Sequence, residues 1–232
     1  MMNDFAKTIT ERPTWLGIPP KQGLYDPQFE HDACGVGFVA NIKGVKSHEI
    51  VRQALTILVN LRHRGATGCE KNTGDGAGIL FQVPHKFLAR ECAALGFSLP
   101  LPGEYGVGMV FLPSDPEARA AAEKVVETVI QAEGQIFLGW RTVPTRNQTL
   151  GATACSVEPF VRQIFIGRNP SLQDEMAFER KLYVIRAVAT HTIRRSGKFK
   201  DGQQFYVPSL SFKTIITRGC SCPSRSRSSS PI

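Results

Sequence analysis

The sequence has no apolar run near the ~20 residues that a membrane-spanning helix needs, which excludes an integral membrane protein. Residues 1–33 have no apolar signal-peptide core and are interrupted by proline and acidic residues, which excludes a secretory signal. Without such a signal, we expect a soluble, cytoplasmic chain whose six cysteines are free thiols in a reducing compartment. At 232 residues and 42% hydrophobic composition, the chain is long enough to bury a substantial core.

Acidic residues are missing from two segments, residues 190–200 and 217–232, which together carry seven of the eight net positive charges. The rest of the chain is therefore nearly neutral. A solvated face and tail explain this local basic character more simply than a binding groove does. The alternative is a basic nucleic-acid-binding module built on these two segments, whose affinity would fall steeply with salt.

Three stretches of different composition divide the chain. Residues 1–33 form an irregular leader, residues 34–216 a domain with alternating elements, and residues 217–232 a low-complexity Arg/Ser tail that we expect to be disordered. Strands are expected at 36–42, 79–83, 107–112, 135–142, 159–167 and 204–208, and helices after Ser47 and at 85–95, 116–132 and 173–195. This alternation predicts a layered architecture of helices and sheets.

Two helix starts are marked by their first residues. Ser47 can accept hydrogen bonds from the amides of the first turn, and Asp115 precedes a proline that suits the first helical position. The apolar faces that the helical period predicts contain Ile50, Val51, Ala54, Leu55, Leu58 and Leu61 in the first helix and Ala118, Ala122, Val125, Val129 and Ala132 in the other.

A cysteine stands at the junction of the leader and the first expected strand, in the run Glu-His-Asp-Ala-Cys-Gly-Val-Gly-Phe at residues 30–38. If the bond between Ala33 and Cys34 is cut, the thiol and a free α-amine belong to one residue. That amine, with a pKa of about 7.7–8.0, can act as a general base near neutral pH. The alternative is an ordinary small core residue, and spacing alone favours it.

A second run, Leu-Arg-His-Arg-Gly-Ala-Thr-Gly at residues 61–68, follows the first expected helix. A guanidinium just past a helix end, such as that of Arg64, suits bidentate capture of a carboxylate. The alternative is that the basic residues complement the helix dipole and Gly65 ends the helix. Taken by itself, the run favours the alternative.

The remaining patterns give little indication of a catalytic or binding site. The glycine-rich run at residues 73–78 lacks the Lys-Ser/Thr of a phosphate-binding loop, and a tight turn explains it. Cys220 and Cys222 have the wrong spacing for zinc, and we predict no metal site. His85 and His191 lie on expected helices and need no special role.

Three runs together resemble the start of the large subunit of bacterial glutamate synthase. They are residues 23–40, which contain Phe-Glu-His-Asp-Ala-Cys-Gly-Val-Gly-Phe, residues 61–68, and residues 73–80, Thr-Gly-Asp-Gly-Ala-Gly-Ile-Leu. The runs stand in the family's order and spacing, and the similarity extends to about Ile216.

The resemblance implies a class II glutamine amidotransferase domain of the N-terminal-nucleophile type. Its fold class would be α+β, a four-layer αββα sandwich, here incomplete. A propeptide would be removed between Ala33 and Cys34, so that Cys34 attacks the amide carbon of L-glutamine. Arg64 matches the residue that holds the α-carboxylate of the substrate. The complete enzyme would use the ammonia to convert 2-oxoglutarate to glutamate, with electrons from reduced pyridine nucleotide (NADPH type) through a small subunit, FMN and an iron–sulfur cluster.

The sequence departs from the family after residues 211–216, where the Arg/Ser tail replaces the expected continuation. A frameshift or a truncated reading frame would explain the change. The family's oxyanion-hole motif, Asn-Gly-Glu-Ile-Asn, does not occur in the sequence. Because loss of one oxyanion donor costs about 10²–10³ in turnover, we expect this chain alone to have little or no activity.

Overall fold

A computed structural model of the chain describes residues 21–24, 26, 35–61, 70, 73–74, 76–148, 150–195, 199 and 201–220. The chain divides into two compact units, Met1–Gly35 and Val36–Ile232. In the first unit Lys21 and Asp26 form an ion pair at 2.8 Å, and most of the expected leader lies outside the described residues. The elements that follow all belong to the second unit.

Four antiparallel strands form the larger sheet. Their order is β3 (Ile136–Thr142), β4 (Phe160–Gly167), β2 (Tyr105–Leu112) and β5 (Tyr206–Ser211). The central strand β2 is buried along nearly its whole length, as its continuous apolar run predicts. A Cβ atom at Gly106 would lie 2.5 Å from Cδ1 of Leu182, so glycine at this position lets a helix approach the sheet closely.

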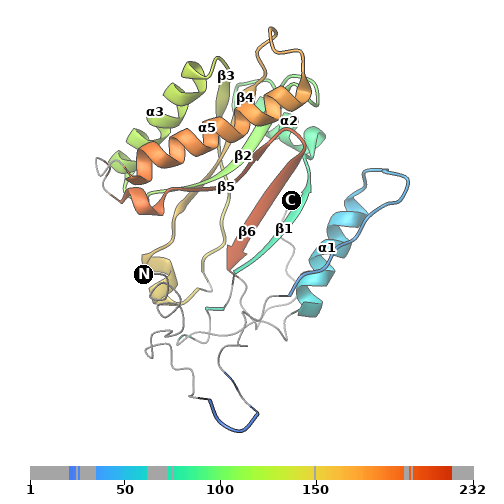
Figure 1. Cartoon of the computed structure of the whole chain (residues 1–232), viewed down its shortest axis with the longest axis vertical. Coiled ribbons are helices and arrows are strands. Elements are labelled where there is room, and N and C mark those ends of the chain that lie inside the picture. The colour runs from blue at the N-terminus through green and yellow to red at the C-terminus, as the bar shows by residue number, and fades with distance from the viewer. Residues whose placement is uncertain are drawn as a thin grey trace, which may run out of the picture. The chain divides into compact units, whose positions relative to one another are not determined.

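Two helices, α3 (Pro116–Ala132) and α5 (Glu175–Arg195), cover one face of this sheet (Figure 1). The carboxylate of Asp115 accepts a hydrogen bond from the backbone N–H of Ala118 at 2.9 Å, and proline stands in the first turn, which confirms the predicted start of α3. The buried residues of the two helices are Ala118, Ala122, Val126, Val129, Ile130, Phe178, Leu182, Ile185, Ala189 and Ile193. The predicted face of α3 therefore missed Val126 and Ile130 and wrongly included Ala132, which is exposed.

The opposite face of the sheet packs on a second core. That core joins it to α2 (His85–Ala94) and to a two-stranded antiparallel sheet of β1 (Gly76–Gln82) and β6 (Thr214–Cys220). Its buried members are Leu88, Cys92, Tyr105, Val107, Phe165 and Ile215. The helix α1 (His48–Asn60) contacts β1, and two short elements, α4 (Ala152–Ser156) and the 3₁₀ turn η4 (Gly202–Gln204), complete the described set. Helices packed on antiparallel sheets confirm the predicted α+β class.

The strand predicted at residues 36–42 is absent: the described residues 35–47 contain no strand. The apolar side chains of Val36, Phe38 and Ile42 are 90%, 91% and 103% exposed. Alternating apolar residues favour a strand only where a neighbouring strand offers hydrogen-bond partners, and no described strand pairs with this segment. The helix that follows it begins after Ser47, as predicted, but the Ser47 side chain makes no capping hydrogen bond.

Residues 217–220, the first four of the expected Arg/Ser tail, lie in β6, and residues 221–232 lie outside the described residues. This part of β6 pairs with residues 76–79 of β1. A Cβ atom at Gly78 would lie 2.5 Å from the carbonyl oxygen of Thr217, so glycine allows the two backbones to meet. The sequence analysis predicted no strand over any part of β6. Backbone hydrogen bonds, which need no apolar side chains, hold the part at residues 217–220 in place.

No helix in the described ranges combines the length and apolar character needed to cross a membrane.

Candidate functional site

The two candidate site residues, Cys34 and Arg64, lie outside the described residues, as does Gly65. The nearest described residues are one position after Cys34 and three positions before Arg64. Gly35 directly follows Cys34, and α1 ends at its C-cap Leu61, three residues before Arg64. The predicted helix that leads to the 61–68 run is therefore confirmed.

The glycine-rich run at residues 73–78 leads directly into a strand. We expected a tight turn there, but β1 begins at Gly76, and both Gly76 and Gly78 pair with residues of β6. Both glycines therefore lie in a paired strand, and the turn explanation is wrong for them. Gly78 also allows the close approach of the two backbones.

A compact set of hydrogen bonds joins the start of this run to the turn that begins α4. The two oxygens of the Glu70 carboxylate accept from the backbone N–H of Thr153 at 2.9 Å and from the hydroxyl of Thr73 at 3.0 Å. The Thr73 hydroxyl in turn accepts from the backbone N–H of Gly151 at 3.2 Å. We call these four residues the Glu70 clasp.

The hydrogen bonds of the clasp also affect the pKa of the Glu70 carboxyl. The hydrogen bond from the Thr153 backbone lowers the pKa of Glu70, with a smaller contribution from the Thr73 hydroxyl and a partial opposition from desolvation. Glu70 is therefore charged at neutral pH. Sequence reasoning missed the clasp because its two sides are about eighty residues apart and neither side carries a recognisable motif.

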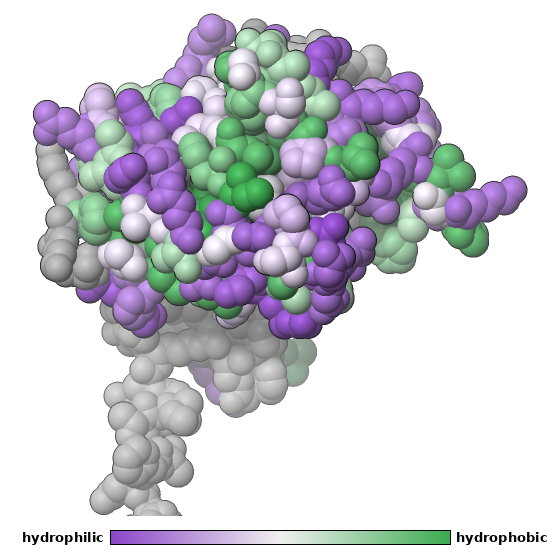
Figure 2. Space-filling view, turned by 90° about the horizontal axis from the view of Figure 1, so that it is seen from above, coloured by the Kyte–Doolittle hydropathy of each residue, from purple (hydrophilic) through white to green (hydrophobic). Residues whose placement is uncertain are grey.

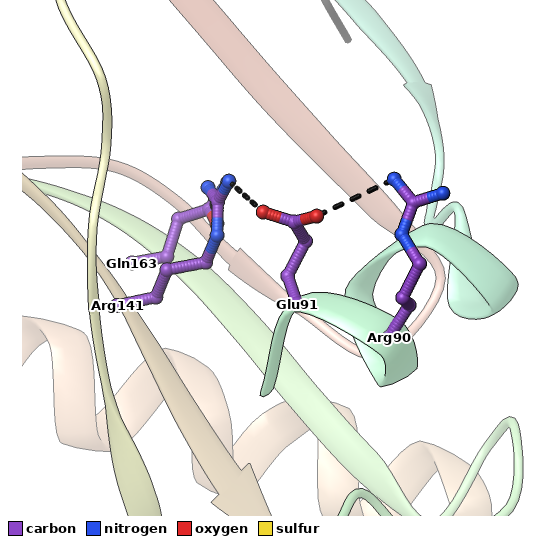
Figure 3. A network of polar contacts seen from close by, with 4 residues as sticks. All are labelled: Arg90, Glu91, Arg141 and Gln163. Atoms are coloured by element: carbon purple, nitrogen blue, oxygen red, sulfur yellow. Dashed lines mark hydrogen bonds and ion pairs between the residues drawn. The ribbon is translucent and has the colours of Figure 1, made fainter. Parts of the chain in front are cut away.

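A second polar network ties α2 to the larger sheet (Figure 3). The guanidinium of Arg141, 9% exposed, donates to Glu91 at 2.8 Å and to the side-chain oxygen of Gln163 at 3.1 Å. Arg90 pairs with the other oxygen of Glu91 at 3.4 Å. The bond from Arg141 lowers the pKa of the Glu91 carboxyl, so this carboxylate is an ion-pair partner rather than a proton donor.

One described thiol, that of Cys92, lacks the character of an activated nucleophile. Cys92 is fully buried, and desolvation raises its pKa to about 11, which keeps it protonated and inert at neutral pH. Cys155 is exposed. The neighbouring Tyr105 is also buried, which raises its pKa to about 12, and its hydroxyl lies 3.1 Å from Nδ1 of His85.

Within the ranges that the structure describes, no group of three or more His, Cys, Asp or Glu side chains converges as a metal site would require. Neither described histidine that the sequence singled out belongs to such a group. His85 contacts Tyr105, and His191 lies on the exposed side of α5.

Comparison with known proteins gives the chain a family. A family model described as class-II glutamine amidotransferases matches residues 34–227. The chain is 46% identical over 210 residues to the glutamate synthase (NADPH) large chain of Bacillus subtilis, covering 90% of this chain and 13% of that protein. It is 40% identical over 217 residues to the glutamate synthase (NADH) of Schizosaccharomyces pombe, with coverages of 91% and 10%.

A ferredoxin-dependent glutamate synthase 2 from Synechocystis is 39% identical over 191 residues, with coverages of 82% and 12%. The chain thus spans only 10% to 13% of the length of these curated relatives. None of these matches supports the alternative of a nucleic-acid-binding module. Since the family match begins at Cys34 and takes in most of the sequence, the chain belongs to the class-II glutamine amidotransferases.

Proposed function

We propose that the chain carries the ammonia-releasing glutaminase part of a glutamate synthase, with Cys34 as its nucleophile. The observation that carries this proposal is the family match, which begins at Cys34, together with 46% identity to a glutamate synthase large chain. A nucleophile that uses its own α-amine must be the first residue of the mature domain. The match starts at residue 34, directly after the expected leader, residues 1–33.

The reaction divides into two acyl-transfer steps. The Cys34 thiol loses its proton to the α-amine, and its sulfur forms a bond to the amide carbon of L-glutamine. The carbon–nitrogen bond then breaks, and the proton held by the amine leaves with the nitrogen as ammonia. Water attacks the glutamyl thioester, the carbon–sulfur bond breaks, and glutamate and the free thiol are released.

Arg64 is proposed to hold the α-carboxylate of glutamine. A guanidinium offers two parallel N–H donors to a carboxylate, which fixes the orientation of the substrate as well as its affinity. In the sequence, Arg64 follows Leu61, the C-cap of α1, by three residues.

The larger reaction is proposed for the longer protein to which such a domain belongs. There ammonia would aminate 2-oxoglutarate, with NADPH as the electron source through a small subunit, FMN and an iron–sulfur cluster. The described residues contain no converging cysteines or other ligand group for a cluster.

The test is covalent capture of the nucleophile in the purified 232-residue chain. N-terminal sequencing should find Cys34 as the first residue. A glutamine-like diazoketone, 6-diazo-5-oxo-L-norleucine, should then add one equivalent to Cys34, as measured by intact mass and peptide mapping. Glutamine should slow this labelling because it competes for the same carboxylate and amide contacts.

Two variants control the labelling experiment. Cys34→Ser should not be labelled, whereas Cys155→Ser, which removes an exposed thiol, should be labelled like the parent chain. A chain that keeps Met1 or Met2 as its first residue and takes up no diazoketone would refute the proposal. Because no Asn-Gly-Glu-Ile-Asn motif occurs in the sequence, we expect labelling to be easier to detect than turnover, which should fall by at least ~10²-fold.

A further inference from the structure

Helix α5 and strand β5 pack side by side at one edge of the larger sheet (Figure 1). A groove of about 620 Å³ lies between them. One wall is a stripe of α5 side chains from Tyr183 to Arg195, and the other consists of Gln203, Tyr206 and Val207. On its open side, β5 pairs with no described strand, so the groove follows a free edge of the sheet.

The second half of α5 brings positive charge to this groove. That half has no Asp or Glu, and its three arginines, Arg186, Arg194 and Arg195, all line the groove. None of them pairs with a described carboxylate, whereas Arg180, nearer the start of the helix, pairs with Asp174 at 3.1 Å. The last two arginines also complement the negative end of the helix dipole, an effect confined to the last turn. Arg186 lies nine residues before that end, so the dipole does not explain it.

The described polar contacts of two of these arginines are with neutral oxygens. Arg186 donates to the carbonyl oxygen of Pro208 in β5 at 3.4 Å, and Arg194 donates to the side-chain oxygen of Gln203 at 3.2 Å. Each guanidinium has five N–H donors, so these contacts position the groups without neutralising their charge. Because Pro208 has no N–H and its carbonyl is already bonded, this edge is poorly suited to adding a strand, and a ligand would be recognised through side chains.

Two tyrosines add flat apolar surface to the groove. Tyr183 is 60% exposed and Tyr206 is 40% exposed, and the guanidinium carbon of Arg186 lies 5.4 Å from the centre of the Tyr183 ring. Tyr and Arg are enriched at protein interfaces, whereas Lys, Asp and Glu are depleted there. Among the described residues that line the groove, none is Lys, Asp or Glu. The composition is therefore that of an interface whose charge is entirely positive.

We propose that this groove docks an extended acidic peptide segment of another protein. Its carboxylates pair with Arg186 and Arg195, and its backbone lies against the two tyrosines. A carboxylate suits a guanidinium because it accepts two parallel N–H donors. A second copy of this chain is a poor occupant, since each copy carries a net charge of +8. The inference needs neither Cys34 nor Arg64, so it stands or falls separately from the glutaminase proposal.

The test measures binding of a defined acidic peptide to the purified 232-residue chain. The probe is a dye-labelled peptide of three Glu-Gly-Glu-Ala repeats, followed by fluorescence anisotropy at low ionic strength. We expect a dissociation constant of about 10–100 μM, and binding at least roughly tenfold weaker for the same peptide with Gln in place of Glu. Arg186→Gln and Arg195→Gln should each raise the dissociation constant by about three- to fivefold, and the double variant by roughly tenfold or more.

Two control variants match the changes in charge. Arg180→Gln removes one charge from the same helix outside the groove, and the double variant Arg225→Gln/Arg227→Gln removes two charges from the end of the chain. Both should keep the dissociation constant within about twofold of the parent chain. Thermal unfolding by circular dichroism checks Arg186→Gln, which also loses the bond to Pro208. The Arg195 side chain is exposed, so Arg195→Gln should leave the fold unchanged.

Four outcomes would overturn the proposal. The first is no binding of the acidic peptide up to about 1 mM, where the interaction would be too weak for a docking site. The second is equal binding of the Gln peptide, and the third is an equal loss of affinity in the groove variants and their charge-matched controls. The fourth is tighter binding of an oligonucleotide of twelve thymidines that is lost in the same groove variants, which would assign the groove to nucleic acid instead.

Discussion

The helices α5 and α1 show how differently one sequence pattern can be used. Both present apolar residues at helical spacing, and α1 separates its polar and apolar faces more sharply. Yet five side chains of α5 are buried in the main core, whereas no residue of α1 is buried. The pattern therefore predicts where a helix forms, while its degree of burial depends on the surface opposite.

Exposed apolar side chains by themselves do not distinguish these two regions. Figure 2 shows hydrophobic residues grouped near the middle of the face seen from above, surrounded by hydrophilic ones. Such exposure is usual in folded proteins. The difference lies in what each helix packs against. Together with α3, α5 packs on the larger sheet. Among the described elements, the only substantial contact of α1 is with β1 of the two-stranded sheet.

Truncation of one apolar side chain in each helix should give the largest contrast. Phe178 in α5 is fully buried, and Phe178→Ala should lower the free energy of unfolding by about 3–5 kcal/mol because it leaves a cavity in a packed core. Leu58 in α1 is only partly buried, and Leu58→Ala should cost less than about 1 kcal/mol. Urea unfolding followed by circular dichroism measures both values.

If Phe178→Ala does not fold, Phe178→Leu, with an expected loss of about 1–2 kcal/mol, keeps the comparison measurable. Equal losses at Leu58 and Phe178 would contradict the contrast between the helices.

The ion pair between α2 and the larger sheet should give an intermediate, pH-dependent effect. Glu91→Gln should cost about 1 kcal/mol at pH 7, because it removes the charged partner of the nearly buried Arg141. The pKa of Glu91 in the folded chain lies below its ordinary value of 4.5. The stabilisation is therefore complete above that pH and is lost as the pH falls through the folded pKa.

Unfolding of the parent chain and Glu91→Gln at several pH values tests the sign of this effect. The difference in stability should shrink on acidification and should not change between pH 6 and pH 8. A difference that grew toward low pH would show that the carboxylate does not stabilise the fold. Arg90→Gln, which removes the more exposed of the two partners, should behave nearly like the parent chain.

Local sequence signals predicted most of the elements in the larger sheet and its helices. Asp115 and its following proline marked the start of α3, and the apolar run of β2 marked a buried strand. The strand expected at residues 36–42 failed, because apolar alternation does not supply a partner strand. The whole of β6 was missed for the complementary reason, since its pairing with β1 depends on backbone contacts that composition does not report.

The candidate site shows the same division. The resemblance named Cys34 and Arg64 from their own motifs, and these assignments stay predictions because both residues lie outside the described ranges. The clasp could not be predicted, because Glu70 and Gly151 are ordinary residues whose meaning arises only when distant segments meet. Local motifs could be recognised in the sequence, whereas contacts between segments far apart in the sequence could not.

The two helix N-caps give the smallest and most closely matched comparison. Asp115→Ala should cost about 1 kcal/mol, because the Asp115 carboxylate accepts from the first turn of α3. Ser47→Ala should change the stability by no more than a few tenths of a kcal/mol, because the Ser47 hydroxyl makes no such bond in α1. From the sequence, both residues are expected to cap a helix. The two substitutions therefore differ in whether a capping hydrogen bond is lost. A loss at Ser47 as large as that at Asp115 would show that α1 is capped in solution and contributes to the cooperative fold, which would erase the contrast between the two regions.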